Sequence, residues 1–220
     1  MISKVEYIDS WNKLHGNPQN SKIIKGWLNF TYQITNSLIR KNNHNSNLPN
    51  IITSVSILIS LLYFLFVPGK FAFLLIILAL LLDGFDGPVA IITSSTSKWG
   101  AVFDSVADRI SESFWLLGIY RALKLPGWCE ILIFLLWSGG LIQEYLRARF
   151  NALFIEKKQT PTTEVTSINE RPVRAIFLIF IAILQMKFWP ISAIILVIAF
   201  LFQLIAIIQI GRDSYQRLST

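Results

Sequence analysis

Apolar runs fill most of the chain after residue 48, and no other feature limits its fold as strongly. A helix needs about 20 mostly apolar residues to cross a bilayer. Six stretches approach or reach this length, at about 50–67, 71–93, 100–123, 127–149, 173–188 and 190–211. Short breaks that contain proline separate several neighbouring stretches, as in tight turns between antiparallel helices. The sequence therefore predicts an all-α membrane protein with six transmembrane helices.

The composition agrees with a membrane protein. Hydrophobic residues make up 53% of the chain and charged residues only 15%, whereas soluble domains carry about 25% charged residues. The net charge of +7 favours anionic lipid headgroups over nucleic acid as the partner. Cys129 is the single cysteine, which excludes an internal disulfide and a cysteine-based metal site.

The first 48 residues are polar and basic, without the early apolar stretch of a secretory signal peptide. Within them, apolar side chains recur on one face of a predicted helix over 21–42, and basic residues flank it. This pattern is typical of an amphipathic helix that lies at the membrane interface. We divide the chain into a juxtamembrane region (1–48), a six-helix domain (49–211) and a cytoplasmic tail (212–220).

Basic residues are distributed unequally between the two sides of the predicted bundle. The side that holds both termini carries fifteen Lys and Arg residues, and the opposite side carries four. Cytoplasmic loops are enriched in these residues. We therefore expect a multi-pass protein of the cell membrane with both termini in the cytoplasm.

Four carboxylates interrupt the second and third apolar stretches. Asp83 and Asp86 are three residues apart, and Asp104 and Asp108 are four apart, so each pair shares one helix face. Both pairs fall near the same leaflet, where unneutralised carboxylates would repel one another. Oxygen ligands without Cys or His select Mg²⁺, Mn²⁺ or Ca²⁺, and two such ions would clamp a phosphate or pyrophosphate. A cation- or proton-translocating relay, or pairing with Arg109, would also explain buried acids.

The spacing of these residues resembles the signature of the CDP-alcohol phosphotransferase family, D-x2-D-G-x2-A-R-x8-G-x3-D-x3-D. All intervals are kept, and seven positions match: Asp83, Asp86, Gly87, Ala90, Gly100, Asp104 and Asp108. Residues 49–53, Pro-Asn-Ile-Ile-Thr, are similar to the family's Pro-Asn-x-x-Thr at the start of the first helix. Two positions depart from the pattern: Ile91 stands where the signature has Arg, and Ser56 where many relatives have Arg.

The resemblance implies six helices, an amphipathic N-terminal helix, a homodimer and a site that opens to the cytoplasm. It implies that Asp83, Asp86, Asp104 and Asp108 bind two Mg²⁺ ions, or Mn²⁺, and that Asp108 is the general base. It also implies a donor site for CDP-diacylglycerol at Asn50, Ile51, Ile52, Thr53, Gly87 and Ser97. An alcohol would attack the lipid-bearing phosphate and release CMP.

Four arginines suggest which alcohol the protein uses. Arg147, Arg149, Arg171 and Arg174 stand at the predicted cytoplasmic ends of the fourth and fifth stretches. Arginine at such positions anchors helices to headgroups, and it also makes bidentate, charge-assisted bonds to phosphate. The segments Tyr-Leu-Arg-Ala-Arg and Glu-Arg-Pro-Val-Arg resemble the bacterial phosphatidylinositol phosphate synthases, which implies inositol 1-phosphate as the acceptor. The alternatives are a phosphatidylglycerophosphate synthase-like enzyme that uses glycerol 3-phosphate, and a non-catalytic or ion-transporting membrane protein.

Overall fold

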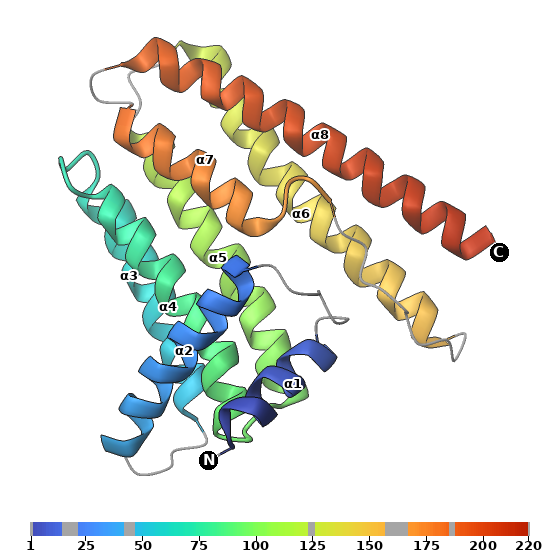
Figure 1. The fold of residues 1–220 in the computed structure, drawn as a ribbon. Helices are drawn as coiled ribbons and strands as arrows, with labels where there is room; N and C mark the ends of the chain where they lie inside the picture. The colour runs from blue at the N-terminus through green and yellow to red at the C-terminus, as the bar shows by residue number, and fades with distance from the viewer. Residues whose placement is uncertain are drawn as a thin grey trace. The chain divides into compact units, whose positions relative to one another are not determined.

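The computed structural model describes residues 2–14, 22–41, 47–122, 126–156, 167–184 and 188–219. All regular structure in these ranges is α-helical (Figure 1). The helices are α1 (Lys4–Leu14), α2 (Lys22–Lys41), α3 (Leu48–Phe66), α4 (Phe73–Ile92), α5 (Lys98–Ala122), α6 (Gly127–Glu156), α7 (Arg171–Leu184) and α8 (Trp189–Ser219). Each of the six predicted apolar stretches coincides with one of the helices α3 to α8, which confirms the all-helical class.

Four helices in the described ranges, α3, α4, α6 and α8, have the length and apolar composition to cross a membrane. α5 does not qualify because it carries several charged residues, and α7 is 14 residues long. At 1.5 Å per residue α7 spans about 21 Å, less than the ~30 Å hydrocarbon core. Large apolar side chains on the qualifying helices, such as Leu58, Ile131 and Ile194, are exposed, as expected for helices in contact with lipid. The chain is a membrane protein. The prediction that six helices cross the membrane stays a prediction.

The chain divides into two compact units. The first comprises Met1–Ile59 and Leu78–Ser111, and the second comprises Ser60–Ile77 and Glu112–Thr220. α3, α4 and α5 each contribute residues to both units. The predicted domain boundaries are not tested by this division. Residues 157–166, between α6 and α7, lie outside the described ranges. The predicted tail is helical as far as Ser219, because α8 continues to that residue.

In the first unit, α1 packs against α2, although the sequence analysis did not predict α1. Its first turn is fixed by a capping box, in which the backbone N–H of Ser3 donates to Glu6 Oε2 at 2.7 Å and the N–H of Glu6 donates to Ser3 Oγ at 3.3 Å. Tyr7 of α1 and Leu28 of α2 are buried in one apolar cluster with Ile91 and Ile92 of α4. α2 is a helix, as predicted, and its face that carries Leu28 is covered by other parts of the protein.

Two features near the end of α4 shape the backbone of this unit. Pro88 lies inside the helix and has no N–H to donate to the carbonyl four residues earlier. After Ile92 the chain closes the helix with a Schellman motif: Ser94 N–H donates to the Ile91 carbonyl at 3.1 Å, and Ser95 N–H donates to the Ala90 carbonyl at 2.9 Å. Ser94 takes the left-handed position with φ of 54°. This turn ends α4 close to the first residues of α5.

In the second unit, α8 packs along α6 and α7 (Figure 1). Small residues permit close approach of these helices. A Cβ atom at Gly139 of α6 would lie 2.8 Å from Gln203 Cγ of α8, and a Cβ atom at Gly118 of α5 would overlap the Tyr63 ring of α3. Trp115 is buried and donates its indole N–H to Ser60 Oγ at 3.0 Å. The helices of this unit are thus joined by both apolar and polar contacts.

Candidate active site

Three of the four predicted carboxylates converge in the first unit. Asp83 of α4 and Asp104 and Asp108 of α5 each place one carboxylate oxygen within 4.8 Å of the others. All three side chains are half-buried. The four-residue spacing in α5 puts Asp104 and Asp108 on one face, as predicted. Clustered hard oxygen atoms of this kind fit a divalent cation such as Mg²⁺, Mn²⁺ or Ca²⁺.

Asp86, the fourth predicted ligand, is not a member of this group of three. It is 8% exposed, and its carboxylate accepts hydrogen bonds from the Thr53 hydroxyl at 2.6 Å and from the Gly87 N–H at 2.6 Å. The hydroxyl oxygen of Thr53 also lies 3.1 Å from the carbonyl oxygen of Pro49 in the same helix. The Pro-Asn-x-x-Thr segment of α3 and the acidic segment of α4 therefore meet at this hydrogen bond.

A cavity of about 950 Å³ lies beside the carboxylates in the first unit. Asp83, Asp86 and Asp104 line it together with four of the predicted donor-site residues, Asn50, Thr53, Gly87 and Ser97. Ile51 and Ile52 are on the same turn of α3 as Asn50 and Thr53, but they do not line the cavity. Asp108 does not line it either. Ile51 is 47% exposed. The structure thus brings most of the predicted donor-site residues to one cavity.

The first turn of α5 also borders this cavity. Ser97 caps the helix, because its Oγ accepts a hydrogen bond from the Gly100 N–H at 2.9 Å. Residues 97–101 all line the cavity. The N-terminus of a helix has outward-pointing N–H groups and a positive dipole end, which favour a phosphate group.

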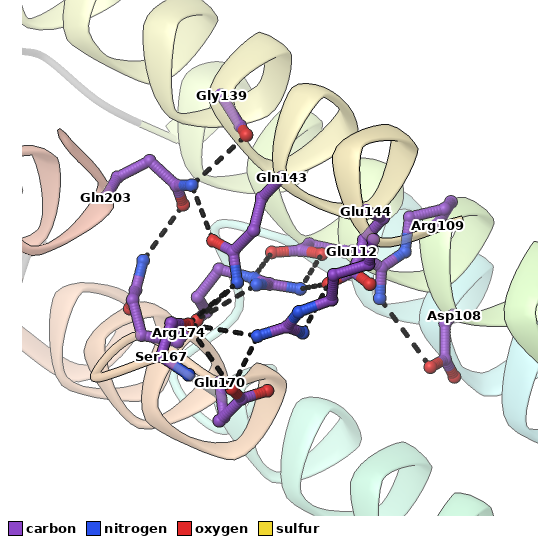
Figure 2. A network of polar contacts seen from close by, with 12 residues as sticks. Asp108, Arg109, Glu112, Gly139, Gln143, Glu144, Ser167, Glu170, Arg174 and Gln203 are labelled. Carbon is purple, nitrogen blue, oxygen red and sulfur yellow. Dashed lines mark hydrogen bonds and ion pairs between the residues drawn. The ribbon is translucent and has the colours of Figure 1, made fainter. Parts of the chain in front are cut away.

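Arg109 forms an ion pair with Asp108, with 3.6 Å between Nη2 and Oδ2 (Figure 2). Pairing with Arg109 was one of the alternatives for the acidic residues. This ion pair involves Asp108. The carboxylate oxygen atoms of Asp83, Asp104 and Asp108 also lie close to one another. The ion pair therefore does not by itself account for the cluster.

Two of the four predicted acceptor arginines, Arg147 and Arg174, bind glutamates in the second unit. Figure 2 shows Arg174 between Glu112 and Glu144. Arg174 of α7 is 5% exposed and pairs with Glu112 at 2.7 Å and with Glu144 at 3.2 Å. Arg147 of α6 pairs with Glu144 at 3.4 Å and also with Glu170. These two guanidinium groups hold α5, α6 and α7 together, a role that the sequence analysis did not assign to them.

The other two arginines have different surroundings. Arg149 is exposed, and because it follows Arg147 by two residues, its side chain leaves α6 about 200° away around the axis. The guanidinium of Arg171 lies 5.9 Å from the centre of the Trp115 ring. The structure therefore does not direct Arg147 and Arg149 to one face of α6.

Sequence reasoning missed the polar side chains that complete this network. Gln203 of α8 donates to the Gln143 side-chain oxygen at 2.7 Å and to the Gly139 carbonyl at 3.1 Å, and its own side-chain oxygen accepts from Asn169 at 2.9 Å. Glu112 had a usable signal, since it continues the four-residue spacing of Asp104 and Asp108. Gln143, Asn169 and Gln203 lie in three separate segments of the chain, and no spacing in the sequence indicates that they meet.

The profile of the family described as CDP-alcohol phosphatidyltransferase matches residues 46–205. The chain belongs to this family. The match includes the acidic cluster, the donor-site residues and all four arginines, whereas α1 and α2 precede it.

Individual relatives give narrower matches. The chain is 38% identical to an archaetidylinositol phosphate synthase of Aeropyrum pernix over 111 residues, which cover 49% of this chain and 55% of that protein. It is 40% identical to a CDP-diacylglycerol--serine O-phosphatidyltransferase of Helicobacter pylori over 67 residues, 29% of this chain and 28% of that protein. These matches thus extend over about half, or less, of the relatives' own length.

Solved structures share the fold. Mycobacterium tuberculosis phosphatidylinositol phosphate synthase (PgsA1) with CDP-DAG bound aligns with a TM-score of 0.68 and 20% identity over 84% of this chain and 93% of that chain. The same protein in complex with manganese and citrate aligns with a TM-score of 0.67 and 20% identity, over 84% and 88% of the two chains.

Proposed function

We propose that the protein transfers the phosphatidyl group of CDP-diacylglycerol to inositol 1-phosphate and releases CMP. The observation that carries this proposal is the convergence of Asp83, Asp104 and Asp108 beside a cavity large enough for a nucleotide-linked donor. Family membership supports the phosphatidyl transfer. The matches to an archaetidylinositol phosphate synthase and to phosphatidylinositol phosphate synthase support the acceptor.

The carboxylates are suited to bind divalent cations. We propose that Asp83, Asp104 and Asp108 bind Mg²⁺ or Mn²⁺, with Asp86 as a further ligand of a two-ion site. The manganese complex of the related fold supports this assignment. When bound, such ions stabilise the negative charge of the donor pyrophosphate and of the departing CMP.

Asp108 is proposed to be the general base. An alcohol is a weak nucleophile at neutral pH and needs a base within hydrogen-bond reach. The acceptor oxygen forms a bond to the phosphorus that carries diacylglycerol, the bond from that phosphorus to CMP breaks, and the acceptor proton passes to Asp108. Asn50, Thr53, Gly87 and Ser97 orient the donor from the cavity wall, with Ile51 and Ile52 in the same turn of α3. The N–H groups at the start of α5 favour its phosphates.

The acceptor phosphate is proposed to interact with the arginines at the ends of α6 and α7, Arg147, Arg149, Arg171 and Arg174. Arg147 and Arg174 are bound by glutamates, and we assign them a supporting role. We assign direct contact to Arg149, which is exposed, or to Arg171, which is the first residue of α7. Guanidinium groups suit this role because they make charge-assisted bonds to phosphate.

The remaining expectations concern the membrane. We propose six spans, with α5 and α7 stabilised among the more apolar helices, and α2 at the interface. Both termini and the active site face the cytoplasm, as the distribution of basic residues indicates. A homodimer is the proposed assembly.

The acceptor is tested by offering CDP-diacylglycerol with inositol 1-phosphate, free inositol, glycerol 3-phosphate or serine to the purified protein. Mass spectrometry of the lipid product should detect the phosphatidylinositol phosphate as the main product. A larger yield with glycerol 3-phosphate would favour a phosphatidylglycerophosphate synthase-like enzyme. A larger yield with serine would favour the activity named for the Helicobacter relative. Equal use of free inositol and inositol 1-phosphate would contradict the phosphate contact.

A further inference from the structure

The residues just before α7 are held by hydrogen bonds from side chains of the neighbouring helices. Residues 167–170, which we call the α7 entry segment, are not helical. Gln143 of α6 donates to the Asn169 carbonyl at 3.1 Å and to Ser167 Oγ at 3.3 Å. Arg174 of α7 donates to the same carbonyl at 3.1 Å. Figure 2 shows Gln143, Ser167 and Arg174 in one polar network.

α8 holds the α7 entry segment from another direction. The backbone N–H of Ile168 donates to Gln209 Oε1 at 3.1 Å, and the side-chain amide of Asn169 donates to Gln203 Oε1 at 2.9 Å. Asn169 is buried, and buried backbone groups outside a helix need such partners. Side chains of α6, α7 and α8 therefore fix the course of this short segment.

The α7 entry segment sets the position of Arg171. Glu170 begins α7, since its carbonyl accepts hydrogen bonds from the N–H groups of Val173 at 2.9 Å and Arg174 at 3.1 Å. The carboxylate of Glu170 is bound by Arg147 of α6. Arg171 is the first residue of α7 and directly follows this fixed backbone.

The glutamines that hold the segment belong to otherwise apolar helices. α6 and α8 have the composition of membrane spans, yet Gln143 and Gln203 are fully buried in them. Burial of an amide costs free energy unless it is hydrogen-bonded, and a bonded polar network rigidifies the groups that it joins. A guanidinium that binds a substrate phosphate benefits from such rigidity, because a displacement of about 1 Å can cost roughly 100-fold in rate.

We propose that Gln143 is a positioning residue for the acceptor phosphate. It holds the α7 entry segment and thereby keeps Arg171 in the place from which the guanidinium binds the phosphate of inositol 1-phosphate. Gln143 acts through Arg171 and does not touch the acceptor. This inference rests on the proposed function, and it selects Arg171 as the arginine that makes the direct contact.

The test is a double-mutant cycle of Gln143→Leu and Arg171→Gln in the full-length protein. The readout is kcat/KM for inositol 1-phosphate at saturating CDP-diacylglycerol. In the wild-type background, Gln143→Leu should lower this value roughly 5- to 100-fold and leave the KM for CDP-diacylglycerol nearly unchanged. In the Arg171→Gln background it should lower the value by less than about 2-fold, because the group that Gln143 positions is already gone.

Two further variants separate positioning from stability. Leu196→Ala removes a fully buried apolar side chain of α8; it should lower the midpoint of thermal unfolding and affect both substrates alike. Ser167→Ala removes the hydroxyl that Gln143 and Arg147 bind. It replaces Gln143→Leu in the cycle if that variant does not fold, and the same pattern is expected.

A loss of the same factor in both backgrounds would overturn the inference, because Gln143 would then act independently of Arg171. Wild-type acceptor kinetics in Gln143→Leu or in Arg171→Gln would also overturn it, as would an equal loss for donor and acceptor. If the wild type makes the phosphatidylinositol phosphate while the cycle shows independent losses, the proposed function stands and the inference alone fails. A wild type that releases no CMP with inositol 1-phosphate contradicts both.

Discussion

The arginines at the ends of α6 and α7 differ in what their side chains contact. Arg147 and Arg174 are held by glutamates, whereas Arg149 is exposed and Arg171 lies over an indole ring. Replacement of Arg149 or Arg171 therefore tests phosphate recognition while the guanidinium groups of Arg147 and Arg174 stay with their glutamates.

If Arg149 or Arg171 binds the acceptor phosphate, its replacement by glutamine removes a charge-assisted hydrogen bond worth ~1.5 to 3 kcal/mol. Steady-state kinetics should then show a loss of roughly 10- to 150-fold in kcat/KM for inositol 1-phosphate, with a much smaller change in the KM for CDP-diacylglycerol. Arg212→Gln, at an exposed position of α8, is the matched control. Headgroup anchoring predicts instead that both substrates are affected alike and that the variants express poorly.

At the scale of helices, a buried ion pair connects α5 and α7. The side chains of Glu112 and Arg174 are 9% and 6% exposed, and Glu144 of α6 adds a second carboxylate. Removing one partner of such a pair leaves an uncompensated charge, which costs about 3 to 5 kcal/mol, whereas replacing both by apolar residues is often neutral.

We therefore expect Arg174→Met to lower the midpoint of thermal unfolding in detergent and the double variant Glu112→Leu/Arg174→Met to recover most of the loss. Glu144 keeps Arg147 as its partner in the double variant. Arg217→Met breaks the pair with Asp213, whose side chains are far more accessible at 28% and 35% exposure, and should change the midpoint much less. Equal destabilisation by the single and the double variant would contradict a pairwise role for Glu112 and Arg174.

The helices differ in how far sequence reasoning could predict them. α3, α4, α6 and α8 are long apolar segments bounded by breaks in the sequence, and their positions follow from that pattern. α5, with several charged residues, and α7, with 14 residues, follow it less clearly. α1 has only 11 residues, and its apolar face is small. Its position depends on the contact of Tyr7 with Thr31, a residue 24 positions away, which no local pattern reveals.

Within the site, too, local sequence patterns predict only part of the contacts. Fixed spacing along α5 predicted that Asp104 and Asp108 share a face, and Asp83 joins them. The hydrogen bond from Thr53 to Asp86 and the pairing of Arg147 and Arg174 with glutamates depend on which helices become neighbours. Spacing in one helix carries no information about such contacts.

At the scale of the whole molecule, the proposed reaction brings a lipid donor and a water-soluble acceptor to one site of a helical membrane protein. We propose that the clustered carboxylates drive release of CMP from CDP-diacylglycerol with the help of divalent cations. Four helices suited to a bilayer and a cavity lined by acids, small residues and a helix N-terminus are the structural basis of that claim.

The most direct test measures CMP release from CDP-diacylglycerol and inositol 1-phosphate by the purified protein. The wild type should release CMP in Mg²⁺ or Mn²⁺, lose activity in EDTA and regain it when the cation is restored. Asp83→Asn, Asp104→Asn and Asp108→Asn should each abolish turnover, whereas Asp213→Asn, a change in the half-buried ion pair on α8, should behave like the wild type. Activity that persists in EDTA, or wild-type rates in any two of the three cluster variants, would contradict the account.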